Sequence, residues 1–282
     1  MIELLVGDDM LNLETIKKSV VVNYNYFIER VKDVTPPNEL FIMNEDMMRS
    51  RIEDLTIEKA SIFDKTIEDY QYNGLTNTII VNKKYLERKD IFLENLYMDM
   101  ALMVALYNPE RKISGFGTEK FWALNKGIRE MLALSLVNQG RSTEYFESDE
   151  YVYANIVSLM IDPLDLQLSY YKNDPEIFIE KMNPLLSQEL DKFNKINMLA
   201  NYNMKSRLSE KSNSKLAFIQ SELFELFLST NPTKEQVDTF LANTVSNSAV
   251  FKDSQKYKRL DALNFDSMYE DYMQTMETGK TY

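Results

Sequence analysis

The segment ALNKGIREMLAL, Ala123 to Leu134, carries the pattern around which the rest of the chain can be organised. Its apolar residues recur at helical spacing, so it lies within a predicted helix over residues 118–137. Gly127 in the middle of this helix is typical of a position where another helix packs closely. Glu130 is typical of a helix carboxylate that faces solvent or pairs with the neighbouring basic side chains. These features alone predict an ordinary packed helix.

Two predicted elements precede this helix. The stretch TNTIIVN, Thr76 to Asn82, is short and rich in β-branched residues, which predicts a strand. We expect this strand at the edge of a small sheet. Residues 91–106 (IFLENLYMDMALMVAL) are apolar on nearly all sides, which predicts a buried helix. Further helical patterns occupy residues 13–31 and most of the chain from residue 150 onward.

The composition favours a fold dominated by helices. The 282 residues include only 7 Gly and 7 Pro, so long loops should be few. We therefore predict an α+β class that is predominantly helical. Residues 1–90 would form an N-terminal α+β part with the edge strand 76–82, and residues 91–282 would form a helical part. Both parts could also belong to one continuous domain.

Charge and missing residue types exclude several classes of function. The 44 acidic and 32 basic residues give a net charge of -12, which disfavours binding to nucleic acid and to anionic membrane surfaces. No apolar run is long enough for a transmembrane helix and no secretory signal is evident, so we expect a cytoplasmic protein. The chain has no Cys and no His, so thiolate and imidazole ligands and the histidine-dependent nucleophiles are excluded.

The order of the predicted elements resembles that of the bacterial zincin-type metallopeptidases. In that family a strand borders the substrate cleft, the next helix carries HExxH, and a later helix carries a glutamate ligand in the pattern N-E-G-x-x-E. The resemblance covers about residues 74–160. The stretch ALNKGIRE keeps Asn125, Gly127 and Glu130, and it has Lys126 in place of the first glutamate. Glu130 therefore falls where the family places its third metal ligand.

The first helix of the resemblance lacks the family's metal ligands. Aligned on HExxH, Met98 and Leu102 take the two histidine positions, and Asp99 takes the position of the catalytic base. In a slipped register, Glu94 takes the position of the base instead. Methionine and leucine cannot replace two imidazoles that lie one turn apart on a helix face. The resemblance thus implies a degenerate site, in a zincin-like core that binds no metal and has no catalytic residue or cofactor.

A zincin-like core without its metal predicts a pseudoenzyme that binds another protein. The former substrate cleft is then the expected binding surface, and an oligomer is compatible with it. The candidate contacts are Asn125, Gly127, Tyr97 and Tyr151.

Two other hypotheses stay open. An acidic, helix-rich chain without Cys or His also suits a structural component of a larger assembly, such as a virion. The third hypothesis is a hydrolase in which Asp99 and Glu130 hold a hard cation or act as an acid–base pair.

Overall fold

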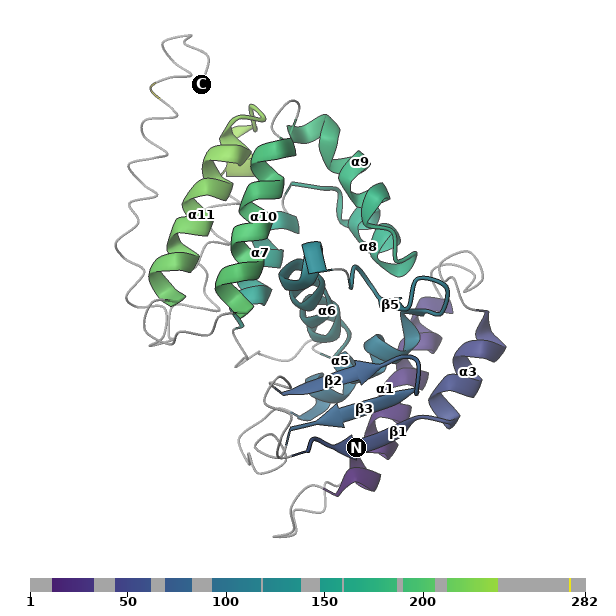
Figure 1. Cartoon of the computed structure of the whole chain (residues 1–282). Helices are drawn as coiled ribbons and strands as arrows, with labels where there is room; N and C mark the ends of the chain where they lie inside the picture. The colour runs from purple at the N-terminus through teal and green to yellow at the C-terminus, as the bar shows by residue number, and fades with distance from the viewer. Residues whose placement is uncertain are drawn as a thin grey trace. The chain divides into compact units, whose positions relative to one another are not determined.

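The computed structural model consists mainly of helices, with a small mixed sheet and a short β-ladder, so the predicted α+β, predominantly helical class is confirmed (Figure 1). The chain divides by its internal contacts into two compact units. Unit 1 comprises Met1–Ser114 and Ala133–Gln139, and unit 2 comprises Gly115–Leu132 and Gly140–Tyr282. The structure describes residues 12–32, 44–61, 69–82, 93–117, 119–137, 148–158, 160–186, 190–205, 212–237 and 274.

Unit 1 ends its first segment at Ser114, whereas the sequence suggested a division near residue 90. The reason lies in two helices, α1 (Leu13–Lys32) and α5 (Leu93–Ala105), which pack against each other. This packing keeps α5 with the N-terminal part of the chain. Both helices match predicted ones, over 13–31 and 91–106.

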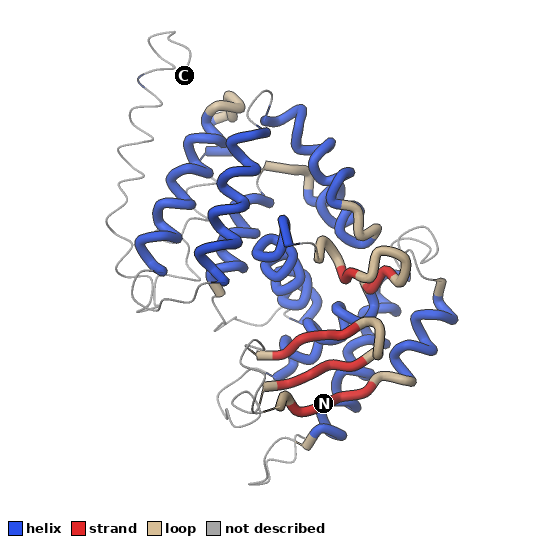
Figure 2. Tube along the Cα trace, in the orientation of Figure 1, coloured by secondary structure: helices blue, strands red, loops and turns tan. Residues whose placement is uncertain are grey.

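The sheet of unit 1 has three strands in the order β1-β3-β2 (Figure 2). β1 (Thr56–Lys59) runs parallel to β3 (Thr78–Val81), and β2 (Tyr70–Asn73) runs antiparallel to β3. The strand predicted over 76–82 is present, but its expected edge position is wrong, because β3 lies between the other two strands. Three of its four residues are buried, which suits a central strand whose backbone groups are paired on both sides.

Unit 1 also contains α3 (Glu45–Glu53) and a ladder formed by β4 (Tyr107–Asn108) and β5 (Ile113–Ser114). The side chain of Asn44 caps α3, because it accepts a hydrogen bond from the backbone N–H of Met47 at 2.9 Å. The sequence pattern gave no prediction for α3, β1 or β2.

Unit 2 is helical in its described residues, and aromatic side chains fill its core. Phe116 contacts the rings of Tyr170 and Phe178 at centroid distances of 5.1 and 5.3 Å, and Phe178 in turn contacts Phe193 at 6.2 Å. Such ring pairs add to the stabilisation that burial provides. Residues of α6 from Ala133 onward belong to unit 1. The elements of unit 2 are η1 (Glu119–Phe121), α6 (Trp122–Val137), α7 (Asp149–Ser158), α8 (Pro163–Tyr171), α9 (Pro175–Leu186), α10 (Leu190–Lys205) and α11 (Ser212–Leu228).

The predicted helix over 118–137 is present as η1 followed by α6. No helix within the described residues combines the length and the apolar character that a membrane crossing needs.

Candidate functional site

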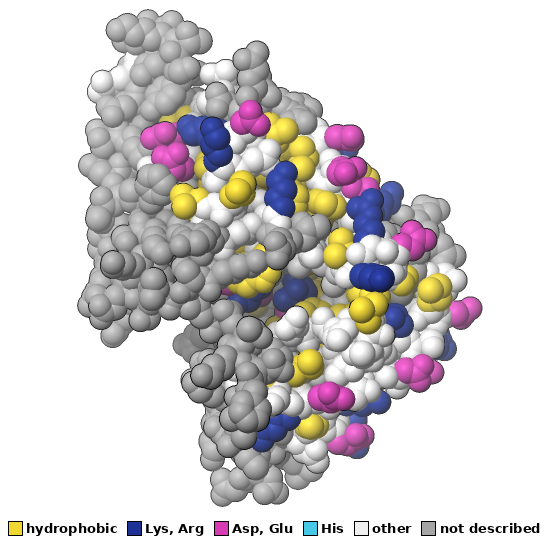
Figure 3. Space-filling view, in the orientation of Figure 1, with side chains coloured by type: hydrophobic (Ala, Val, Ile, Leu, Met, Phe, Trp, Pro, Cys, Tyr) yellow, Lys and Arg dark blue, Asp and Glu magenta, His cyan; other side chains and the backbone are white. Residues whose placement is uncertain are grey.

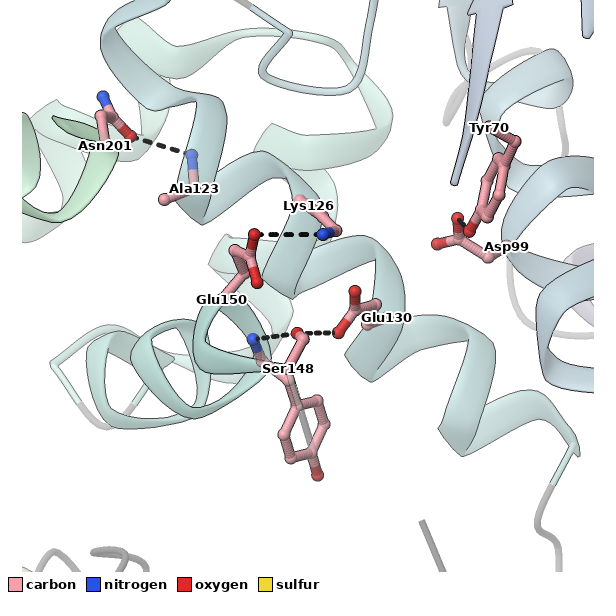
Figure 4. Close-up of polar contacts among 9 residues, drawn as sticks. Tyr70, Asp99, Ala123, Lys126, Glu130, Ser148, Glu150 and Asn201 are labelled. Atoms are coloured by element: carbon pink, nitrogen blue, oxygen red, sulfur yellow. Dashed lines mark hydrogen bonds and ion pairs between the residues drawn. The ribbon is translucent and has the colours of Figure 1, made fainter. Parts of the chain in front are cut away.

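The candidate metal-ligand positions on α5 lie in the packed interior of unit 1. Met98 and Leu102, one helical turn apart, both have 0% of their surface exposed. Asp99 beside them is 3% exposed, and its carboxylate accepts a hydrogen bond from the hydroxyl of Tyr70 in β2 (Figure 4). The face that would carry HExxH is therefore occupied by apolar packing and by one hydrogen-bonded carboxylate.

Glu130, the third ligand position, is half-buried on α6 in unit 2. Its Oε2 accepts a hydrogen bond from the hydroxyl of Ser148 (Figure 4). The Oγ of Ser148 accepts in turn from the backbone N–H of Tyr151 at 2.9 Å, so Ser148 acts as the N-cap of α7. Burial raises the pKa of the Tyr151 hydroxyl, and the negative charge of Glu130 raises it further. Glu130 thus supports the start of the next helix.

An ion pair joins α6 to α7 one turn before Glu130. The ammonium of Lys126, at the position of the first glutamate of the family pattern, lies 3.0 Å from Oε1 of Glu150. The two side chains are only 22% and 9% exposed, and Lys126 also lies 5.7 Å from the Trp122 ring. An ion pair this sheltered is screened less than one at the surface. Acidic side chains at a helix start are usually solvated, whereas Glu150 is only 7% exposed.

Gly127 and Asn125 serve the packing of unit 2. A Cβ atom on Gly127 would lie 2.0 Å from the backbone oxygen of Glu150, so α6 and α7 cross in direct backbone contact here. The side chain of Asn125 accepts from the backbone N–H of Phe116 at 2.7 Å, and its backbone carbonyl accepts from the Tyr170 hydroxyl at 3.0 Å. Asn125 therefore fixes the loop that precedes α6.

Tyr97 and Tyr151 differ in exposure. Tyr97 on α5 is 5% exposed, and burial raises the pKa of its hydroxyl, although a hydrogen bond with Ser19 lowers it. Tyr151 is half-buried. Among the four candidate contacts, Tyr97, Asn125 and Gly127 thus lie inside their units, and a partner could reach them only after a rearrangement. The side chain of Glu94 lies outside the described residues.

Sequence reasoning did not identify two asparagines of α10 that hold the start of α6. The side chains of Asn197 and Asn201 both donate to the backbone carbonyl of Lys120, and Asn201 Oδ1 accepts from the backbone N–H of Ala123 at 2.9 Å (Figure 4). Asn197 also accepts from the hydroxyl of Tyr153 at 3.0 Å. The available signal was a pair of amides spaced one turn apart on a helix with apolar neighbours, a pattern that many solvated helices share.

Within the part of the chain that the structure describes, no three Asp, Glu, His or Cys residues come together in a group that could hold a metal ion. Each candidate carboxylate instead accepts a hydrogen bond from a hydroxyl of its own unit, Tyr70 for Asp99 and Ser148 for Glu130. Comparisons with models of protein families, with curated proteins and with solved structures found no match to this chain.

Proposed function

We propose that this chain is a non-catalytic protein with a zincin-like core and that it works by binding another protein. The observation that carries the proposal is the state of Met98 and Leu102, which are apolar and wholly buried at the two histidine positions. A catalytic zinc needs three protein ligands and an open position for water. Two fully buried apolar side chains provide neither a ligand nor access for water.

The bonds of the two candidate carboxylates support the same proposal. The carboxylate of Asp99 accepts from Tyr70, and that of Glu130 accepts from Ser148, which caps α7. A general base would have to release such a partner before it could accept a proton from a substrate or water. This arrangement therefore favours structural roles and weighs against the hydrolase hypothesis.

The order of elements is the third support. β3, α5, α6 and α7 follow one another as the resemblance implies, and Gly127 of the N-E-G-x-x-E pattern packs against α7. The net charge of -12 and the interleaved acidic and basic side chains on the face seen in Figure 3 favour a protein partner over nucleic acid.

The first experiment measures metal content and peptidase activity. The purified chain is incubated with zinc and dialysed, its zinc is measured by elemental analysis, and it is then assayed on a mixed peptide library. We expect less than one tightly held zinc per chain and no cleavage. One zinc per chain together with cleavage would overturn the proposal.

The second experiment tests the zincin-like core by restoring the histidines. In the variant with Met98→His and Leu102→His, zinc should raise the melting temperature, because a ligand that binds only the folded state stabilises it. The matched control places the pair at Met100 and Val104, which are equally buried on α5 with the same spacing. Equal gains from zinc at both pairs, or no gain at either, would contradict the zincin-like core.

The third experiment separates a binding module from a structural component. Light scattering after size-exclusion chromatography gives the mass of the particle in solution. We expect a monomer or a small oligomer. A stable higher-order assembly would favour the structural hypothesis instead.

A further inference from the structure

Arg51 of α3 is a half-buried cation whose contacts are all with neutral groups. Its Nη2 donates to the hydroxyl of Tyr72 at 2.6 Å and to the backbone carbonyl of Gly74 at 2.7 Å. The guanidinium also lies 4.4 Å from the centre of the Tyr107 ring. None of the ion pairs among the described residues includes Arg51. These contacts hold the guanidinium in one place, and within the described ranges it has no carboxylate at ion-pair distance.

Part of the guanidinium has no hydrogen-bond acceptor among the residues that the structure describes. Both hydrogen bonds use Nη2, and the buried Nε meets no acceptor among the described residues. The donors on Nη1 are therefore left for a ligand. Nη1 carries two N–H donors, and a hydrogen bond between two charged groups is stronger than one between neutral groups.

An open hollow in unit 1 lies beside this cation. Its volume is about 370 Å³, within the range of small-ligand pockets. Three chemical features line it: the cation, an acidic group and an apolar wall. Met47, which forms part of the wall, is a large apolar side chain that is 46% exposed. The lining residues are Asp46, Met47, Ser50 and Arg51 of α3 together with Pro109.

We propose that this hollow binds the C-terminal end of a polypeptide whose last residue is apolar. The terminal carboxylate accepts from Nη1 of Arg51, the last side chain packs on Met47 and Pro109, and the last amide N–H donates to Asp46. Capture of a C-terminal carboxylate is a recurring mode of peptide recognition. Asp46 repels a ligand that carries a second carboxylate nearby, so an apolar last residue is preferred over an acidic one.

This site is independent of the zincin-like core, because none of its residues is a candidate ligand position. The probe is the peptide acetyl-Ala-Ala-Leu with a free carboxylate, titrated into the full chain and followed by NMR chemical shifts. The same peptide with a C-terminal amide is the matched control. Because the lost contact joins two charged groups, the amide should bind at least about tenfold more weakly. Equal binding of the two peptides, or no binding of either, would overturn the proposal.

Variants test the place of binding. Arg51 also holds Tyr72 and Gly74, so its replacement could disturb the fold, and Met47→Glu is the decisive change. A second acidic side chain beside Asp46 should lower the affinity for the free-carboxylate peptide by at least about tenfold. The control is Val22→Glu, which adds the same charge at a 52% exposed apolar position on α1 and should leave binding unchanged. If both variants lowered the affinity for the peptide equally, the effect would come from net charge alone, and the hollow would be rejected as the binding site.

A third peptide, acetyl-Ala-Glu-Ala with an amidated end, distinguishes a terminal carboxylate from a side-chain carboxylate. It should bind at least about tenfold more weakly than acetyl-Ala-Ala-Leu with a free C-terminal carboxylate. Binding of both with equal strength would reject the C-terminal specificity. Either failure leaves the zinc and peptidase measurements untouched, since those report on α5 and α6.

Discussion

Gly127 of α6 lies so close to Glu150 of α7 that a Cβ atom on the glycine would be 2.0 Å from the glutamate's backbone oxygen. In most helices, replacing glycine by alanine adds about 1 kcal/mol of stability. Here the backbone of α7 would have to move, so we expect Gly127→Ala to lower the free energy of unfolding by about 1–3 kcal/mol. Urea unfolding followed by circular dichroism measures this change.

Helix propensity predicts that Gly127→Ala is more stable than the wild type, whereas the close packing of α6 and α7 predicts that it is less stable. The sign of the change in stability is therefore the test. The control is Met198→Ala, at a 64% exposed position of α10 in the same unit, which should change stability by less than about 0.5 kcal/mol. A more stable Gly127→Ala variant would mean that α6 and α7 do not cross here as closely as the structure indicates.

Ser148 and Glu130 should act as one unit in stabilising α7. Ser148→Ala removes the acceptor for the N–H of Tyr151 and should cost about 1 kcal/mol, the usual loss for an N-cap. Glu130→Ala should lower the free energy of unfolding less in the Ser148→Ala background than in the wild type, because the hydrogen bond between the two side chains is then already absent. A double-mutant cycle in urea measures this coupling. Strictly additive losses would show that Glu130 contributes nothing through the cap.

To hold the start of α6, Asn201 should need the N–H donor of its side-chain amide as well as the oxygen. Asn201→Asp keeps the acceptor for the N–H of Ala123 but replaces the donor to the carbonyl of Lys120 by a second oxygen. Two oxygens then face each other in a partly buried contact, so we expect the free energy of unfolding to fall by about 1–3 kcal/mol. Trp122, the single tryptophan of the chain, adjoins this contact and reports it by fluorescence. An unchanged melting curve and unchanged emission would contradict this role of the amide.

The parts of the fold that the sequence predicted are those with a strong local period. The helix over 13–31 has a long apolar stripe, the helix over 91–106 is apolar on nearly all sides, and the strand at Ile79 has a β-branched run. Each of these patterns therefore had one dominant interpretation. β2 was not predicted because YQYN next to Gly74 has the composition of a turn. Its pairing with β3 comes from tertiary contacts, which override local preference.

The candidate site shows the same division between local pattern and three-dimensional contact. Spacing correctly placed Met98 and Leu102 on one face of a helix, but only the structure shows that this face is wholly buried. The hydroxyl partners of Asp99 and Glu130 come from elements 29 and 18 residues away. Three patterns lie outside the described residues: the short apolar run over 39–43, which is compatible with a strand, Asp90, whose residue type favours an N-cap, and most of the tail from residue 251.

The buried tyrosines should make the fold sensitive to alkali. Burial raises the pKa of the Tyr171 hydroxyl from 10.0 to about 12, although a hydrogen bond from Gln167 lowers it. Below pH 10 both the folded and the unfolded chain keep this proton, so stability is unaffected. Between pH 10 and pH 12 the unfolded chain releases the proton and the folded chain retains it, so stability falls as the pH rises.

Tyr171→Phe isolates this contribution. Over those two pH units the wild type should lose roughly 2–3 kcal/mol more than the variant, because only the wild type has an ionisable group at this position. Urea midpoints at pH 8, 10, 11 and 12 measure the difference, and the pH 8 values correct for the packing cost of the substitution. Burial also raises the pKa of Tyr72, Tyr97 and Tyr151, so the variant should still lose stability in alkali, but less steeply. Parallel curves for the two proteins would show that Tyr171 ionises as readily in the folded chain as in the unfolded one.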